Sequence, residues 1–402
     1  MKTRSIILYS LLWGAALFAA CDNHEDANEE ENALPPGREY VKEGNYCLNV
    51  VYYIPKGADT LADWHTIYSS YVKTLQAEFR EQMAICGYPD KTFNLEVNRQ
   101  NPAYVNIIRL EGQIDTVGSQ RIVTEVADYL NRHPEQNKSF FTAIFVPYVG
   151  LSTSVWSLES EMNIVSRGII SSYSGYPLGD DGVGNLMMMF GGMFFLEYNT
   201  EPITEIYYSM MNFDNGPSNW GKASRLLKAD AMWLNQNQIF NHKEKAYYAD
   251  RPEVQVVHAD FKYENDRIEV ACEFTSSRQI VGVIVYNDPW SYPDREDEIG
   301  DNNYTTMDAI PYATDQLNQN GTSYRFTLHI PWKDLPVTYK VPEAGEDYCE
   351  AEIRFRFLVE DGLAVPLVNK GDIESGFRYP YKIKNYIPDF QDKVDTAISA
   401  GK

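Results

Sequence analysis

The segment NLMMMFGGMFFLEYNTEPITE, residues 185–205, decides how the chain is interpreted, because a long apolar run passes directly into a polar one within it. Its apolar side chains recur at helical spacing: Leu186, Met189, Phe190 and Met193. A helix that is apolar over most of its surface is ordinarily buried in a core. The segment therefore predicts a buried helix, and the sequence around it decides whether this helix is only structural.

The segments before this helix alternate between strand and helix patterns. Short apolar runs that are typical of buried strands occupy residues 45–55, 103–110 and 139–150. Residues 63–88 and 119–133 instead carry apolar side chains at helical spacing. Alternating strands and helices predict an α/β layer structure, which we expect to occupy residues 44–245.

The pattern changes to a period of two after Pro252. Alternating apolar and polar residues predict strands over residues 254–263, 267–276, 279–288, 323–332 and 349–360. Turn residues separate these runs, which is typical of an antiparallel β-sandwich. A chain of 402 residues is long enough for two domains. The predicted fold class is therefore an α+β or α/β N-terminal domain followed by an antiparallel β-sandwich over residues 252–390.

The segment around the buried helix resembles the catalytic helix of a known family. A zinc peptidase helix carries two His four residues apart, which both reach the metal, and a Glu between them that acts as general base. Metzincins add a third ligand and then a Met-containing turn. The paired Gly191 and Gly192, followed by the methionines of SMMNFDN at residues 209–215, resemble metzincin-like zinc peptidases among Bacteroidota lipoproteins. That resemblance implies a metzincin-like N-terminal domain and covers most of residues 45–390.

The resemblance also shows what this chain lacks. It places Phe195 at the first His, Leu196 at the catalytic Glu, Asn199 at the second His, Glu205 at the third ligand and Met210 in the methionine turn. Phe195 and Leu196 can neither bind zinc nor take a proton, and no two of the six His stand four residues apart. We therefore expect no catalytic residue, metal or cofactor here, whether the segment is an altered zinc helix or a plain core helix of another α/β domain.

The N-terminus predicts export and lipidation. Basic and then apolar residues predict a signal peptide over residues 1–20. Small residues running into Cys21 resemble the lipobox of bacterial lipoproteins, which implies a lipid anchor on the Cys21 sulfur. Residues 21–43 predict an acidic tether, since six of the ten residues from 22 to 31 are acidic. Such a run resembles the surface-export signal of Bacteroidota lipoproteins and implies the outer face of the outer membrane, with a periplasm-facing anchor as the alternative.

The charge and the cysteines exclude other classes of partner and site. A net charge of −22 argues against nucleic acid as a partner, because the two would repel each other. Cys47, Cys86, Cys272 and Cys349 form no CxxC motif, so a zinc ribbon is not expected. Cys272 and Cys349 are predicted to point into the sandwich core, as free buried thiols rather than as a disulfide.

A second candidate site is the acidic loop at residues 287–304. Trp290, Tyr292 and Tyr304 are interleaved there with carboxylates, and aromatic faces beside carboxylates suit sugars. The simpler interpretation is an exposed loop of the sandwich. The chain as a whole is predicted to be a non-catalytic surface lipoprotein that binds a polypeptide or a glycan. The alternatives are a metal-independent glycoside hydrolase that uses paired carboxylates and an accessory lipoprotein of an outer-membrane nutrient-uptake complex.

Overall fold

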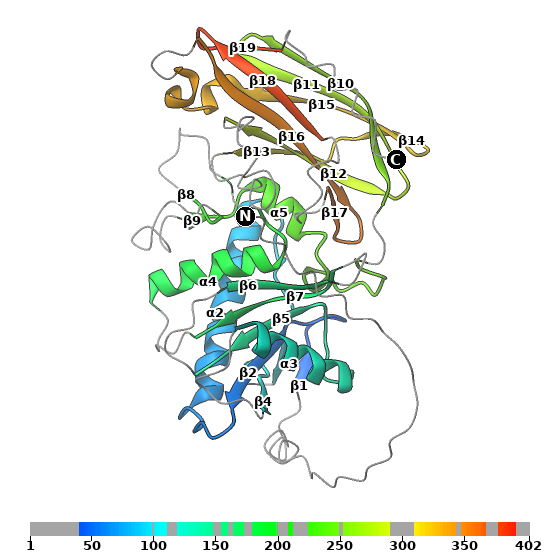
Figure 1. Ribbon diagram of the computed structural model, residues 1–402. Coiled ribbons are helices and arrows are strands. Elements are labelled where there is room, and N and C mark those ends of the chain that lie inside the picture. Colours follow the sequence, from blue (N-terminus) through cyan, green and yellow to red (C-terminus); the bar gives the residue numbers. More distant parts are fainter. Residues whose placement is uncertain are drawn as a thin grey trace, which may run out of the picture.

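A mixed sheet forms the first layer of the N-terminal part (Figure 1). The computed structural model describes residues 40–98, 100–110, 119–147, 154–159, 164–172, 179–197, 199, 208–211, 224–248, 252–289, 309–342, 347–366 and 377–390. The five-stranded sheet has the order β4 (Asn106–Leu110), β2 (Asn49–Pro55), β5 (Phe141–Phe145), β7 (Ile164–Ser171) and β6 (Ser154–Glu159). All neighbours are parallel except β6, which runs antiparallel to β7 at the edge.

Helices cover both faces of this sheet. Helix α3 (Ser119–Arg132) packs Val123 and Val126 against one face, where Val51 and Ile144 point. Helices α2 (Trp64–Ile85), α4 (Asp180–Met193) and α5 (Lys228–Leu234) belong to the larger core on the other face. The strands β2 and β5 are mostly apolar because both of their faces are buried, as in other covered parallel sheets, and Asn49 and Thr142 are their buried polar residues.

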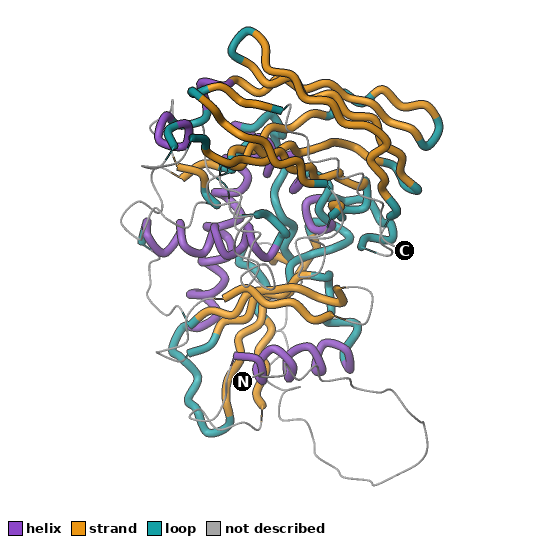
Figure 2. The backbone as a smooth tube through the Cα atoms, turned by 45° about the horizontal axis from the view of Figure 1, so that its top comes forward, coloured by secondary structure: helices purple, strands orange, loops and turns teal. Residues whose placement is uncertain are grey.

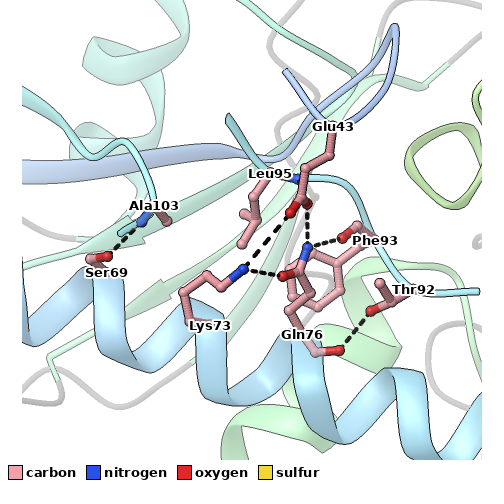
Figure 3. A network of polar contacts seen from close by, with 8 residues as sticks. All are labelled: Glu43, Ser69, Lys73, Gln76, Thr92, Phe93, Leu95 and Ala103. Carbon is pink, nitrogen blue, oxygen red and sulfur yellow. Dashed lines mark hydrogen bonds and ion pairs between the residues drawn. The ribbon is translucent and has the colours of Figure 1, made fainter. Parts of the chain in front are cut away.

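A buried network of hydrogen bonds links α2 to Glu43, near the start of the described chain (Figure 3). Gln76, which is 1% exposed, donates to the Phe93 carbonyl at 2.8 Å and to Glu43 Oε2 at 2.5 Å. Glu43 also accepts from the Leu95 amide at 2.9 Å. Just before it, β1 (Tyr40–Lys42) pairs with β3 (Glu96–Asn98). The described structure thus includes residues 40–43, the last part of the segment predicted as a tether, in contact with the sheet domain.

Two antiparallel sheets form the C-terminal part (Figure 2). The four-stranded sheet has the order β10 (Val254–Glu264), β11 (Arg267–Ser276), β15 (Ser323–Pro331) and β14 (Asn318–Asn320). The six-stranded sheet has the order β13 (Ile310–Thr314), β12 (Ile280–Asp288), β16 (Cys349–Val359), β18 (Arg378–Lys384) and β19 (Ile387–Asp389), with β17 (Ala364–Val365) beside β16. Short helical turns η5 (Trp332–Asp334) and η6 (Val337–Lys340) follow β15. This arrangement confirms an α/β part followed by an antiparallel, β-rich part.

The two parts share one hydrophobic core, to which the segment between the two predicted domains contributes Tyr248. Tyr248 is only 7% exposed. Its ring contacts Phe140 and Phe141 of the N-terminal part, and its amide donates to the carbonyl of Asp361 at 3.4 Å.

Two smaller predictions concern the state of the cysteines and the presence of a membrane-spanning helix. None of Cys47, Cys86, Cys272 and Cys349 forms a disulfide within the described residues, as predicted for the sandwich pair, although Cys349 is only half-buried. Burial raises the pKa of the Cys272 thiol to about 12, so this thiol is a core side chain rather than a nucleophile. None of the described helices is both long and apolar enough to span a bilayer.

Candidate functional site

Helix α4 ends before the residues that the zinc motif would occupy. The last helical residue is Met193, and Phe195 then adopts the left-handed conformation, with φ 74°. The Phe195 amide donates to the Gly192 carbonyl at 3.2 Å and the Leu196 amide to the Gly191 carbonyl at 2.9 Å. This pair of bonds is a Schellman motif, in which glycine is the usual left-handed residue. Phe195 and Asn199 are therefore not one turn apart on a helix face, as two zinc-binding His would be.

Aromatic packing holds Phe195 in this strained conformation. The side chain is 3% exposed and its ring contacts those of Phe140, Phe141 and Tyr248. The guanidinium carbon of Arg167 lies 4.8 Å from the ring centroid. Arg167 also donates to the Gly192 carbonyl at 3.0 and 2.8 Å, which adds a charged donor to a carbonyl that already accepts the Phe195 amide. The position that the resemblance assigns to the first His therefore holds a packed apolar side chain.

Asn199 takes part in a separate, buried hydrogen-bond network. It is 0% exposed, and its Nδ2 donates to Asp230 Oδ1 at 2.9 Å. The Ser209 hydroxyl donates to Asn199 Oδ1 and accepts the Met211 amide at 3.1 Å. Both ends of the Asn199 amide are used, so the side chain has a structural role that needs no metal.

The methionine turn does lie against the end of α4. It follows β8 (Tyr208–Ser209), which pairs with β9 (Ser224–Arg225). Met210 and Met211 are 4% and 1% exposed. A Cβ placed on Gly191 would lie 2.4 Å from Met211 Sδ and 3.2 Å from Met210 Cε. These close atoms are the side-chain ends of the two methionines, so a residue larger than glycine at position 191 would force both side chains to move.

The Gly191→Ala variant tests this contact. We expect the free energy of unfolding to fall by about 1–3 kcal/mol, because the added methyl group overpacks the two methionines. Urea unfolding followed by circular dichroism measures the change. Gly179→Ala is the matched control, since a Cβ there meets no atom within 4 Å. An equal effect in both variants would contradict the close approach of the turn.

The side chains present do not fit a zinc site. No group of three or more His, Cys, Asp or Glu that could hold a metal occurs within the described ranges. The nearby carboxylates are engaged, because Asp230 pairs with Asn199 and Glu197 Oε1 accepts from Arg356 Nε at 2.7 Å. Zinc sites need at least three good protein ligands, and the described positions supply none that is both suitable and available.

The Glu197–Arg356 ion pair joins the two parts of the molecule and was missed from sequence. The two side chains are 1% and 4% exposed. Tyr286 lies in the same region: burial raises its pKa well above the ordinary value, and the charge of Glu197 raises it further. A signal was available in β16, where Arg354 and Arg356 alternate with apolar residues that face the sandwich core. Both faces of this strand are buried, so each arginine requires a partner: Arg356 pairs with Glu197 of the N-terminal part, whereas Arg354 pairs with Asp288 and Glu352 of the sandwich.

A small cavity lies on the opposite face of the sheet, beside the edge strand β6. Its volume is about 60 Å³. The lining residues come from α3, β5, β6, β7 and the segment before β5: Val126, Ala127, Leu130, Asn131, Asn137, Ser139, Thr142, Trp156, Leu158 and Ser166. None of these side chains carries a charge, and none was singled out by the sequence patterns.

The remaining predicted site residues lie outside the described residues. They are Cys21, Glu205, Trp290, Tyr292 and Tyr304. The predicted signal peptide lies outside them too, as does most of the acidic tether. The lipidation site and the ligand loop therefore stay predictions.

Comparisons with known proteins show which solved structures share the fold of this chain. No protein-family model matches the chain, and no curated protein matches it in sequence. The solved structure of wild-type OgpA from Akkermansia muciniphila is 18% identical, with a TM-score of 0.65, and the match covers 87% of this chain and 95% of that one. Catalytically inactive OgpA in complex with an O-glycopeptide substrate, glycodrosocin, is 17% identical, with a TM-score of 0.63 and coverage of 88% and 97%. At this identity the likeness shows the fold alone, and the chain has the fold of OgpA.

Proposed function

We propose that this protein is a non-catalytic, lipid-anchored protein of the cell surface that binds a glycopeptide or polypeptide on a metzincin-like fold. The main observation behind the proposal is that apolar or already hydrogen-bonded side chains occupy the positions after α4 where the resemblance would place zinc ligands. Phe195 is packed among aromatic rings and Asn199 is locked to Asp230 and Ser209, while the fold around them is that of a protein that takes a glycopeptide as substrate. The lipid anchor rests on Cys21 and on the sequence around it.

The chemistry of the site supports binding rather than hydrolysis. A zinc peptidase activates water on the metal and moves its proton to a neighbouring Glu. Leu196, at the Glu position, is apolar and 3% exposed. The next residue, Glu197, accepts from Arg356 in the interface with the sandwich. Neither residue is placed to take a proton from a water molecule beside a bound peptide.

The edge strand β6 is the surface that we propose for an extended peptide. In the described part of the sheet β6 pairs only with β7, so one row of its backbone groups faces away from the sheet. Helix α4 lies along this edge (Figure 1). A peptide can add to such an edge through main-chain hydrogen bonds, with its alternate side chains on the two faces of the sheet.

Binding and its location can be measured together. A synthetic O-glycopeptide should bind the full chain in isothermal titration calorimetry. It should also slow amide hydrogen exchange at residues 154–159, because the edge amides of β6 gain partners. The exposed edge strand β14 of the sandwich (Asn318–Asn320) is the internal control and should not change. Binding without protection of β6 would overturn the proposed location, and no binding of glycosylated or bare peptide would overturn the function.

Two other functions remain alternative proposals. A glycoside hydrolase needs two facing carboxylates, and the described cavity has no carboxylate in its wall. An accessory role in a nutrient-uptake complex would use the same lipid anchor and would show itself as co-purification with a membrane receptor.

A further inference from the structure

Three lysines form a cluster at the junction of the two parts of the chain. Lys91 follows α2, and its Nζ donates to Asn241 Oδ1 at 3.0 Å. Lys243 and Lys245 lie two and four residues beyond Asn241, in the segment that follows α5. The Nζ of Lys245 donates to the carbonyl of Glu360 in the sandwich. These three lysines, called here the lysine patch, therefore lie where the N-terminal part meets the sandwich.

Positive charge predominates in the lysine patch. Burial lowers the pKa of Lys91, and the charges of the other two lysines lower it further. None of the three forms an ion pair with another described residue. Arg278, beside the patch, is paired with Asp361 at 2.6 Å, which leaves Glu244 and Glu360 as carboxylates that offset part of the charge. An anion that binds here relieves the repulsion among the ammonium groups.

Hydrogen bonds hold the lysine patch beside residues near the start of the described chain. Asn45 Nδ2 donates to the His242 carbonyl at 2.7 Å, and the Tyr46 hydroxyl donates to the Lys245 carbonyl at 2.9 Å. The ring of Tyr247 lies 5.4 Å from that of Tyr46, and Lys245 Nζ lies 4.7 Å from the Tyr247 ring centroid. The backbone of the patch is thus in place before any ligand binds, which lowers the entropic cost of binding.

The acidic run of the predicted tether lies within reach of the lysine patch. Its six acidic residues are Asp22, Glu25, Asp26, Glu29, Glu30 and Glu31. A Cβ on Gly44 would lie 3.0 Å from His242 Nδ1, so the N-terminal chain passes the patch at this residue. Tyr40 lies four residues before Gly44, at most about 14 Å away, whereas the nine residues from Glu31 to Tyr40 can span about 30 Å. The run can therefore reach the patch without any change in the described structure.

The net charge of the chain favours this run over an external polyanion. A free polyanion must approach a chain of net charge −22, which repels it. The acidic run is already attached, so its docking is intramolecular and takes place at a high effective concentration. The cations of the patch are lysines, which act as point charges and lack the fork that makes arginine suited to phosphate. Carboxylates of the same chain are therefore the anions that this surface fits best.

We propose that the acidic run at residues 22–31 docks on the lysine patch through ion pairs with its three ammonium groups. The docked run lies across the junction of the two parts. Because Cys21 directly precedes the run, docking brings the predicted lipid anchor next to this surface and turns the junction toward the membrane. The inference goes beyond the proposed function and does not depend on it.

Carbodiimide cross-linking of the purified full chain tests the docking, because this reagent joins a carboxylate to an amine only when the two are in contact. Mass spectrometry should find residues 22–31 joined to the lysine patch within one chain. Lys333, an exposed lysine of the sandwich, is the internal control and should not be joined to the run. Raising the salt from about 0.1 M to about 1 M shortens the Debye length from about 10 Å to about 3 Å and should lower the yield several-fold.

Lys243→Glu reverses one charge of the patch. The Lys243 side chain is exposed and forms no hydrogen bond or ion pair with another described residue, so the circular dichroism spectrum should not change. We expect cross-links from the run to Lys91 and Lys245 to fall by about two- to fivefold, the range for losing an exposed ion pair. Lys333→Glu is the matched control and should leave these yields as in wild type.

Three outcomes would overturn the docking. The first is the absence of cross-links to the lysine patch, or equal yields at Lys333. The second is a yield that neither salt nor Lys243→Glu changes, since the contact would then owe nothing to charge. The third is binding to phosphatidylserine vesicles that Lys243→Glu abolishes, without cross-links to the run, which would assign the patch to a lipid surface instead.

Discussion

Arg356→Met should lower the free energy of unfolding by about 3–5 kcal/mol, the largest effect expected of any single change in this chain. The substitution removes the guanidinium that neutralises Glu197, a carboxylate only 1% exposed. Glu197 Oε2 already has no hydrogen-bond partner within the described part of the chain, so nothing there can replace the lost donor. Urea unfolding monitored by circular dichroism measures the loss.

Two controls decide whether the cause is the unpaired charge. Arg325→Met removes an arginine from an exposed ion pair with Glu273, and it should cost less than about 1 kcal/mol. The double variant Glu197→Leu with Arg356→Met should recover most of the lost stability, because it leaves no buried charge behind. A double variant as unstable as the single one would mean that packing, and not charge, causes the loss.

Asn199→Asp should have a comparable effect that depends on pH. The change replaces the amide nitrogen, 2.9 Å from Asp230 Oδ1, with a carboxylate oxygen in a fully buried place. Two carboxylates so close cannot both ionise, so one pKa of the pair is raised in the folded state. Stability is then lost as the pH rises from the unfolded carboxyl pKa through the raised folded value. We expect a deficit of about 3–5 kcal/mol at pH 8, and a clearly smaller one at pH 4.5.

The direction of this pH dependence distinguishes charge repulsion from the simple loss of hydrogen bonds. Asn320→Asp, at the exposed end of the edge strand β14, is the matched control and should stay within about 0.5 kcal/mol of wild type at both pH values. A deficit in Asn199→Asp that is the same at both pH values would indicate lost hydrogen bonds without charge repulsion, and would contradict the close contact with Asp230.

Periodicity predicted much of the fold because burial dictates it directly. The helical spacing at residues 63–88 and 119–133 corresponds to α2 and α3, and the alternation in RIEVACEFTS corresponds to β11. Met210 and Met211 are buried against α4, while the likeness of this turn to a metzincin methionine turn stays a prediction. What periodicity could not predict was the end of α4, since a left-handed phenylalanine is rare and depends on tertiary packing.

The buried contacts between the two parts of the chain could not be predicted from the sequence for a different reason. Glu197 and Arg356 are far apart in sequence, and each is unremarkable within its own segment. The small cavity beside β6 likewise has walls from α3 and from three strands of the sheet. Such sites arise from the way that distant strands and helices meet, which no local pattern encodes.

The most direct test of the account is an incubation of the purified full chain with an O-glycopeptide and zinc, analysed by mass spectrometry. The account predicts that the peptide stays intact at every time point, with or without added zinc or a chelator, under conditions where calorimetry shows it bound. Cleavage of the peptide that a chelator abolishes would contradict the account, because it would require a working metal site that Phe195, Leu196 and Asn199 cannot provide.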